Sequence, residues 1–320
     1  MSKKLQRYRH NQTIRDLVSE TTVSTNDLIM PIFVHETLTE KREIASLPGL
    51  YQWSLNDVLD EVNEIVALGI KAVILFGIPE NKDAAGSSAS LESGVIQETI
   101  RKIKAAHPKL IVIADCCLCE YTDHGNCGVL NGNTFNTNAT LTRLNEIAVS
   151  YARAGVDIVA PSGMMDGMVR SIRTALDNDN FHGVSIMSYS SKFASSLYGP
   201  FRDAAGSSEF CGDRKHHQLN PSQRKEALRE SIIDEQEGAD YLMVKPVMFY
   251  LDICRDIAEQ SQLPLAAYQV SGEYAMLKQA AASGMADEYD LFHESLLSIK
   301  RAGVSLIITY YAKDFARVGV

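Results

Sequence analysis

Hydrophobic and polar positions divide the chain, from residue 28 onward, into two kinds of segment that alternate. Eight short runs are dense in apolar and often β-branched residues, which is typical of buried strands. These runs are 28–34, 71–76, 110–114, 156–160, 183–187, 240–244, 264–270 and 304–309. The segments between them repeat apolar residues at a spacing of three and four, which predicts amphipathic helices. They are 54–68, 91–106, 139–154, 165–177, 222–237, 249–260, 274–282 with 287–302, and 311–317.

The turns that connect each predicted helix to the next strand are short, and several of them contain glycine. Gly69, Gly155, Gly238 and Gly303 each stand where a helix would end just before a strand. Glycine suits the left-handed backbone conformation of that position. Repeated strand–helix units with such turns predict an α/β fold, a single (β/α)8 TIM barrel over residues 27–320. A doubly wound open sheet is the alternative.

Residues 1–26 differ from the rest of the chain because they are polar and basic. Five basic residues, Lys3, Lys4, Arg7, Arg9 and Arg15, precede the first acidic residue, Asp16. The segment lacks a clear apolar face and is poor in serine, which argues against the alternative of a transit peptide. We expect an extended arm that lies on an acidic surface, such as that of a neighbouring subunit in a homo-oligomer.

Composition excludes several classes of protein. The net charge of −9 over 320 residues argues against general nucleic-acid binding. No window approaches eighteen uninterrupted apolar residues, so we expect no membrane span. The first residues lack the apolar stretch of a secretory signal, so we expect a cytoplasmic protein with reduced cysteines. No GxGxxG, GxxxxGK[ST] or HExxH motif occurs, which leaves dinucleotide, P-loop and zincin sites without an anchor.

Four of the six cysteines gather in one stretch, directly after the strand predicted at 110–114. Cys117, Cys119 and Cys127 can converge on one soft cation, and three protein ligands with an open position are typical of catalytic zinc. Cys116 and His124 are candidates for a fourth ligand that would close the site. There are two alternatives: Cys116 and Cys119 could form a redox pair, or the cysteines could simply be small apolar side chains buried in the core. The ligand type and spacing favour a metal site.

Polar residues follow several strands, at the barrel end where TIM-barrel enzymes have their active sites. Lys245 leaves the core after the run 240–244, so poor hydration should lower its pKa and allow the amine to form a Schiff base with a ketone. A lysine that extends to solvent is the alternative. Lys192 is a second candidate, and two lysines at one rim should lower each other's pKa. Asp115, Ser162, Ser271 and Glu273 also follow strands.

A long loop is predicted from about Ser188 to Asn220, and loops of that length are usually functional. Arg202 and Arg214 in this loop suit a substrate carboxylate, because a guanidinium binds carboxylates through paired hydrogen bonds. Salt bridges to acidic residues of the same loop are an equally supported alternative. Together with the lysines and thiols, the loop indicates imine chemistry, a soft metal and an anionic carbonyl substrate.

Four long motifs resemble the delta-aminolevulinic acid dehydratase family: DCCLCEYTDHGNCG, KFASSLYGPFRDAA, GADYLMVKP and AYQVSGEYAM. The resemblance extends over nearly the whole chain, from TIRDLV at 13–18 to LIITYYAKD at 306–314. It implies a TIM barrel with an N-terminal arm, assembled as a homo-octamer. It also implies a lyase, a porphobilinogen synthase, that condenses two molecules of 5-aminolevulinate to porphobilinogen with loss of two waters, in tetrapyrrole (heme) biosynthesis.

The resemblance also implies roles for individual residues. Lys192 and Lys245 would form Schiff bases, and Cys117, Cys119 and Cys127 would bind zinc, as in the zinc-dependent branch. The implied substrate-binding residues are Arg202, Arg214 and Gln218 for the second substrate and Ser271 and Tyr310 for the first. Glu230 matches a residue associated with an allosteric magnesium. Asp115 is the candidate for orienting the substrate amino group near the metal, and the sequence departs from the family pattern at Cys116, Gly163, Met168 and Val247.

Two other classes compete with this interpretation. A class I aldolase also uses a barrel lysine, but it needs neither three clustered thiolates nor a second imine lysine. A zinc- or redox-sensing protein would explain the cysteines and would leave Lys192, Lys245 and the arginine-rich loop without a role.

Overall fold

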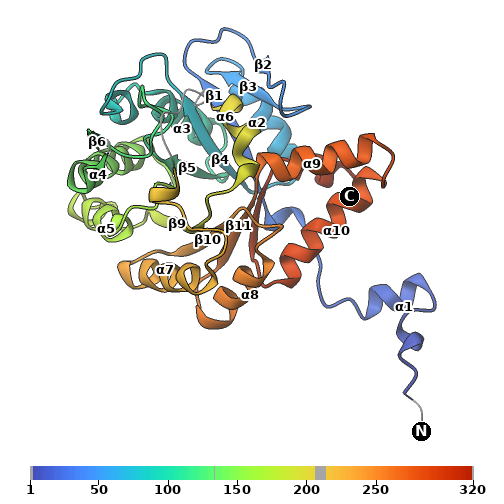
Figure 1. Cartoon of the computed structure of the whole chain (residues 1–320). Coiled ribbons are helices and arrows are strands. Elements are labelled where there is room, and N and C mark those ends of the chain that lie inside the picture. The colour runs from blue at the N-terminus through green and yellow to red at the C-terminus, as the bar shows by residue number, and fades with distance from the viewer. Residues whose placement is uncertain (1–2, 133, 206–213, 319–320) are drawn as a thin grey trace.

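Eight parallel strands close into a barrel in the computed structural model, which describes residues 3–132, 134–205 and 214–318 (Figure 1). Around the barrel the strands are β1 (Leu28–His35), β4 (Ala72–Ile78), β5 (Ile111–Cys116), β8 (Ile158–Pro161), β9 (Ser185–Lys192), β10 (Tyr241–Lys245), β11 (Leu265–Gln269) and β12 (Leu306–Thr309). β12 pairs back with β1, which closes the barrel. The predicted TIM barrel is therefore confirmed, and the open sheet is wrong.

Helices surround the barrel and cover the outer face of its strands (Figure 1). They are α2 (Val58–Ala67), α3 (Val95–Ala106), α4 (Thr137–Ala154), α5 (Met168–Asn178), α7 (Arg224–Glu237), α8 (Leu251–Gln260), α9 (Ser271–Ala282), α10 (Glu288–Arg301) and α11 (Ala312–Val318). The strands are buried on both faces for this reason, which explains their near-continuous apolar sequences. The four glycines predicted at helix ends all have positive φ, between 80° and 104°.

Aromatic rings fill much of the barrel interior beneath the carboxyl ends of the strands. The Phe33 and Phe76 ring centroids lie 5.4 Å apart, and those of Tyr268 and Tyr310 lie 6.0 Å apart. Phe33 also stacks with Tyr310 at 6.2 Å. These residues come from β1, β4, β11 and the end of β12, which are neighbours around the barrel. Their rings therefore pack together on one side of the barrel interior and form part of the floor of the site described below.

One barrel strand is longer than its sequence indicates. The apolar run predicted at 183–187 continues as β9 to Lys192, although residues 188–192 are SYSSK. The predicted long loop therefore begins after Lys192. It contains η4 (Ser196–Tyr198), α6 (Gly199–Ala204) and η5 (Arg214–His216), and residues 206–213 lie outside the described part. We call residues 193–205 the lid.

Two hairpins were not predicted. β2 (Arg42–Glu43) and β3 (Tyr51–Ser54) form a hairpin that adds to the barrel sheet beside β1, and β6 (Leu130–Asn131) pairs with β7 (Thr134–Phe135) after the cysteine-rich loop. The first hairpin contacts the lid, because the Gln52 amide donates a hydrogen bond of 2.7 Å to the carbonyl oxygen of Ala204. It therefore helps to hold the lid over the barrel.

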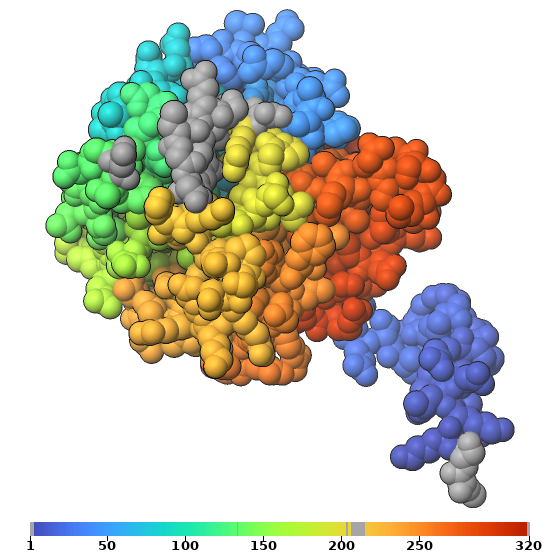
Figure 2. Space-filling model, in the orientation of Figure 1, coloured from blue at the N-terminus to red at the C-terminus, as the bar shows by residue number. Residues whose placement is uncertain are grey.

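The N-terminal segment projects away from the barrel (Figures 1 and 2). Residues 3–24 contain η1 (Leu5–Tyr8) and the short helix α1 (Gln12–Leu17), and neither has a buried residue. η2 (Thr25–Asp27) leads into β1. The segment is therefore not extended throughout, and Leu17 is 83% exposed. Its separation as an arm of residues 1–26, placed on another subunit, stays a prediction.

Within the described residues, none of the helices has the length and apolar character that crossing a membrane requires.

Candidate active site and metal centre

Two lysine side chains lie side by side at the carboxyl ends of neighbouring barrel strands. Lys192 ends β9, Lys245 ends β10, and the two are register partners in the parallel pairing of these strands. Only 6% of Lys192 and 5% of Lys245 is exposed. Both amines therefore lie at the end of the barrel where TIM-barrel enzymes place their chemistry.

A β-bulge in β9 directs a second side chain of this strand toward Lys245. The pairs on either side of the bulge are Leu242 with Ser188 and Val244 with Ser191, so β9 has one extra residue. Side chains of a regular strand alternate between faces, and a bulge changes that alternation. Tyr189 and Lys192 are three residues apart, yet both approach the same place. The Tyr189 ring centroid is 5.0 Å from Lys245 Nζ and 5.5 Å from Lys192 Nζ.

Aromatic rings surround the amine of Lys245. Its Nζ lies 4.3 Å from the centroid of Tyr268, 5.0 Å from that of Phe201 and 5.6 Å from that of Tyr198. Burial, reinforced by the positive charge of Lys192, lowers the pKa of Lys245 to about 7. A large share of the amine is therefore uncharged at neutral pH and able to act as a nucleophile. The pKa predicted from the sequence to be low is confirmed.

The amine of Lys192 has a different environment. Its Nζ donates a hydrogen bond of 2.6 Å to the carbonyl oxygen of Ser162, which follows β8. Burial alone would lower the pKa of Lys192, but nearby negative charges, foremost that of Cys127, outweigh it and raise the pKa. The expectation that each lysine lowers the pKa of the other is therefore correct for Lys245 and wrong for Lys192.

Two buried carboxyl groups lie beside the amines. Asp115, on β5, accepts a hydrogen bond of 3.1 Å from the hydroxyl of Ser162, whose carbonyl binds Lys192. Burial, together with the negative charges of Glu120 and Cys117, raises the pKa of Asp115 well above its usual value. Burial also raises the pKa of Glu120. Carboxyl groups with raised pKa values are suited to exchange protons during a reaction near neutral pH.

Three thiols form a compact cluster next to these groups. The sulfur atoms of Cys117, Cys119 and Cys127 all lie within 4.8 Å of one another, and all three residues are buried. Hydrogen bonds with the other two thiols, and burial, raise the pKa of Cys119 well above its usual value. Buried thiolates need a compensating cation, and three sulfur donors suit a soft or borderline metal ion. The cluster can therefore hold a metal, as the sequence predicts.

The two candidates for a fourth ligand point elsewhere. The Cys116 thiol donates a hydrogen bond of 3.7 Å to the carbonyl oxygen of Leu144 in α4, outside the barrel. The His124 ring accepts from the backbone N–H of Asn126 at 3.1 Å, and its Nε2 lies 3.3 Å from the carbonyl oxygen of Ala84. Neither side chain joins the thiol cluster, which supports a site with an open position for substrate or water.

The lid closes over the barrel and docks on the start of α9. The backbone N–H of Phe201 donates a hydrogen bond of 2.9 Å to the hydroxyl of Ser271, the first residue of α9. The next residue, Gly272, is in such close contact with the lid that a Cβ there would lie 2.4 Å from the carbonyl oxygen of Leu197. Phe201 also contributes its ring to the surroundings of Lys245, so lid and lysine are directly linked.

The other predicted substrate-binding residues are spread around this centre. The hydroxyl of Tyr310 lies 2.9 Å from that of Tyr268, the ring nearest to Lys245. Arg202 is half-buried in α6 of the lid. The side chain of Arg214 lies outside the described part of the chain.

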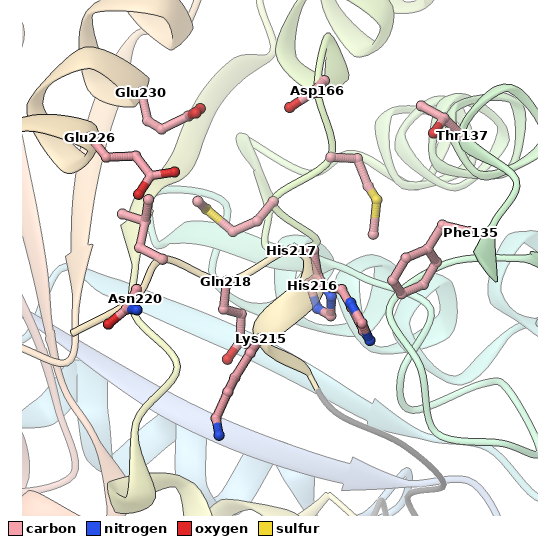
Figure 3. A pocket seen from close by; sticks show the side chains of 13 residues that line it. Phe135, Thr137, Asp166, Lys215, His216, His217, Gln218, Asn220, Glu226 and Glu230 are labelled. Atoms are coloured by element: carbon pink, nitrogen blue, oxygen red, sulfur yellow. The ribbon is translucent and has the colours of Figure 1, made fainter. Parts of the chain in front are cut away.

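Gln218 and Glu230 line a cavity of about 410 Å³ between η5 and α7 (Figure 3). Glu230 and Asp166 direct their carboxylates toward the same end of this cavity, whereas Gln218 and Lys215 lie at the other end (Figure 3). Burial, together with the charge of Asp234 and of Asp166, raises the pKa of Glu230. Glu230 therefore belongs to an acidic pocket and not to the lysine–thiol cluster.

Comparison with known proteins gives one consistent result. A family model described as delta-aminolevulinic acid dehydratase matches residues 2–318. The chain is 51% identical to the delta-aminolevulinic acid dehydratase of Halalkalibacterium halodurans and 50% identical to that of Bacillus subtilis, with 98% and 97% of this chain and 96% of each relative covered. The chain belongs to the delta-aminolevulinic acid dehydratase family. The family predicted from the motifs, and the lyase class that goes with it, are confirmed.

A solved structure extends this agreement to three dimensions. The delta-aminolevulinic acid dehydratase of Toxoplasma gondii, determined in complex with the reaction product porphobilinogen, superposes with a TM-score of 0.97 at 42% identity. The alignment covers 99% of this chain and 92% of that one. The barrel, the lid and the surrounding helices are thus the framework of a delta-aminolevulinic acid dehydratase.

Some residues of this delta-aminolevulinic acid dehydratase site carried no signal in the sequence. Tyr189 approaches the lysines because of the bulge in β9, and Tyr268 approaches Lys245 because β11 pairs with β10. Glu120 lies inside the cysteine motif, where its hydrogen bond of 3.1 Å from the Cys119 thiol places it against the thiol cluster. The one sequence feature that could have marked Glu120 as a site residue is its position directly after Cys119.

Proposed function

We propose that the chain is a porphobilinogen synthase, which condenses two molecules of 5-aminolevulinate to porphobilinogen with loss of two waters in tetrapyrrole (heme) biosynthesis. One observation carries this proposal. Two buried lysine amines are register partners at the carboxyl ends of β9 and β10, and both lie within electrostatic reach of Asp115 and of Cys119 in the thiol cluster. Two imine-forming amines match a reaction that joins two ketone-bearing substrates.

Lys245 is the residue best prepared for the first imine. Its pKa of about 7 makes an uncharged amine available at neutral pH. That amine attacks the ketone carbon of 5-aminolevulinate, and loss of water leaves an imine whose carbon is electrophilic and whose neighbouring carbon is acidic. The surrounding rings of Tyr268, Phe201 and Tyr189 exclude water and so protect the imine from hydrolysis.

Lys192 forms the second imine in this proposal. Its raised pKa means that the ammonium must lose a proton before it can attack. Asp115 is the proposed acceptor of this proton and the proposed orienting group. Ser162 connects the two side chains, because its hydroxyl donates a hydrogen bond to Asp115 and its carbonyl oxygen accepts one from Lys192. Joining the two substrates then forms one carbon–carbon and one carbon–nitrogen bond.

The metal proposed at Cys117, Cys119 and Cys127 is zinc, because thiolates select soft or borderline cations over magnesium. A zinc ion there would supply Lewis acidity toward a substrate group or a bound water. The three residues must be reduced and deprotonated to bind it. We therefore propose a cytoplasmic location, where thiols stay reduced.

The substrate carboxylates have separate proposed anchors. Ser271 and Tyr310 would hold the first substrate, next to Lys245. Arg202, Arg214 and Gln218 would hold the second, next to Lys192. The hydrogen bond from the lid to Ser271 supports this division, since closing the lid completes the pocket around the first substrate.

Two further parts of the proposal concern regulation and assembly. Glu230 and its acidic neighbours Asp166 and Glu226 offer oxygen ligands for an allosteric magnesium, which prefers carboxylates and waters.

The exposed arm would pack on another subunit, and the proposed assembly is a homo-octamer. Its exposed Leu5 and Leu17 support burial against a partner.

Incubation with 5-aminolevulinate, followed by an assay for a pyrrole product, tests the proposed activity. A porphobilinogen synthase gives a pyrrole that increases with time. An aldolase would give no pyrrole, and neither would a metal or redox sensor. Absence of a pyrrole from zinc-loaded protein under reducing conditions would refute the proposal.

A further inference from the structure

We infer that Glu273 is a positioning residue that fixes the distance between the amine of Lys245 and the hydroxyl of Ser271. The inference rests on the proposed function, in which these two groups hold the ketone and the carboxylate of the same substrate. Glu273 touches neither group. It acts through the backbone segments that carry them.

The carboxylate of Glu273 joins the ends of two barrel strands. Its Oε1 accepts hydrogen bonds from the backbone N–H groups of Val247 at 3.1 Å and Met248 at 2.6 Å, both just after Lys245. Its Oε2 accepts one of 2.6 Å from the backbone N–H of Val270, which directly precedes Ser271. One side chain therefore binds the segment that follows β10 and the segment that follows β11.

Both oxygens are needed for this arrangement. Three N–H groups converge on Glu273, and an unsatisfied buried N–H is destabilising. A glutamine has a single acceptor oxygen, so its NH2 group would face at least one of these donors. The last bond also satisfies a free N–H at the start of α9, because Glu273 is the third residue of that helix. Only a carboxylate of this length satisfies both segments at once.

The burial of this charge is costly, which argues for a specific role. Glu273 has 0% exposure, and burial raises its pKa to about 7 despite the three hydrogen bonds. An apolar residue would avoid that cost, although it would leave the donors without a partner. A carboxylate kept in such a place is consistent with holding the two segments in one fixed arrangement.

The arrangement matters because a substrate bound at both ends depends on the span between its two anchors. An imine to Lys245 fixes the ketone carbon, so the carboxylate must then reach Ser271 without distortion. Ser271 also accepts the hydrogen bond from Phe201 of the lid. A shift of the α9 start relative to β10 would therefore disturb both carboxylate binding and lid closure.

Borohydride trapping on Lys245 with two different ketones tests the inference. The first is 4-oxopentanoate, which is the substrate without its amino group and needs both anchors. The second is butanone, which has no carboxylate and needs only the amine. For Glu273→Gln we expect the half-saturating concentration of 4-oxopentanoate to rise about ten-fold and that of butanone to stay within about two-fold of wild type.

Two further variants complete the design. Glu61→Gln removes another buried carboxylate, in α2, where Glu61 is 4% exposed and bonds Lys313, so it controls for general loss of stability. Glu273→Asp keeps both acceptor oxygens and should fall between wild type and Glu273→Gln. If Glu273→Gln does not fold, Glu273→Asp is tested alone, with an expected rise of about three-fold for 4-oxopentanoate.

An equal change for both ketones, or no change for either, would overturn the inference, as would the same change in Glu61→Gln. The proposed function is tested separately, because wild-type protein must form a pyrrole from 5-aminolevulinate. A wild type that forms the pyrrole while Glu273→Gln binds both ketones normally would refute the positioning role alone.

Discussion

At the scale of single residues, the site depends on how burial and neighbouring charges act on ordinary side chains. Lys192 and Lys245 are the same residue type on paired strands, yet burial lowers the pKa of Lys245 and negative charge raises that of Lys192. At neutral pH Lys192 is therefore protonated, whereas a large share of Lys245 is uncharged. This difference gives each lysine a separate task in the proposed reaction.

The pKa of Lys245 leads to a prediction about pH. An amine with a pKa of about 7 becomes uncharged as the pH rises through 7, so the rate of imine formation at Lys245 should increase over that range. A free lysine titrates near 10.4. The unfolded chain therefore binds more protons between about pH 7 and pH 10, and this residue makes the fold more stable as the pH rises.

The measurement is the initial rate of borohydride trapping with butanone between pH 5.5 and pH 9, with peptide mapping to select Lys245. Lys225→Ala, which changes an exposed lysine of α7, is the matched control and should leave the profile unchanged. A rate that stays low up to pH 8 and only begins to rise towards pH 9 would mean that Lys245 keeps the pKa of a hydrated lysine.

A second residue-scale prediction separates Cys116 from the three proposed metal ligands. Because the Cys116 thiol bonds the carbonyl oxygen of Leu144, a serine can make the same contact. Cys116→Ser should keep both bound zinc and activity, whereas Cys119→Ser should lose both. Bound metal is measured by elemental analysis of dialysed protein. Loss of zinc from Cys116→Ser would mean a closed site with four thiolates, and the metal would then be structural.

At the scale of elements, the hydrophobic pattern predicted all eight barrel strands, but it placed the carboxyl end of β9 five residues too early. The runs before Asp115 and Lys245 are apolar because helices cover them, so their pattern is clear. The end of β9 reads SYSSK, because its serines face α7 through polar contacts. The hydroxyl of Ser188 donates a hydrogen bond of 2.6 Å to the carboxylate of Asp234, and the hydroxyls of Ser191 and Ser231 form one of 3.0 Å. A strand that packs on a helix through hydroxyl groups has the composition of a loop.

The site residues that could be predicted are those with their own chemical signature. Three thiols in one short motif indicate a metal, whatever the fold around them. The ring of Tyr189 gave no such indication, because a bulge decides which way it points and bulges depend on pairing with a distant strand. The ring of Tyr268 gave no indication either, because its place beside Lys245 depends on the pairing of β11 with β10.

A prediction about the lid belongs to this scale. Gly272→Ala adds a Cβ that would lie 2.4 Å from the carbonyl oxygen of Leu197, so the lid must move away from α9. We expect KM for 5-aminolevulinate to rise about ten-fold, with little loss of thermal stability, because the lid carries part of the pocket around Lys245. Steady-state kinetics and a melting curve measure the two effects.

Gly183→Ala is the matched control, because a Cβ there meets no atom within 4 Å. It should leave both KM and the melting temperature unchanged. An unaltered KM in Gly272→Ala would mean that the contact between lid and α9 has no part in substrate binding.

At the scale of the whole molecule, the N-terminal segment is the part that the barrel does not explain. Its two helices contain no buried residue, it carries five basic side chains, and it belongs to a chain whose overall net charge is −9, so the rest of the chain is more acidic still. Deleting residues 1–26 should therefore reduce the size of the assembly, as measured by multi-angle light scattering. Deleting only residues 1–2 is the control. An unchanged mass after the longer deletion would mean that the segment does not hold subunits together.

The central claim is that two lysines of one barrel each form an imine with substrate. The most direct test is to trap zinc-loaded protein with borohydride during turnover of 5-aminolevulinate and to map the modified peptides by mass spectrometry, with Lys245→Ala as the reference. The account predicts reduced adducts on Lys245 and Lys192, and loss of nearly all turnover in Lys245→Ala. Pyrrole formation with neither lysine modified, or with ordinary turnover in Lys245→Ala, would contradict it.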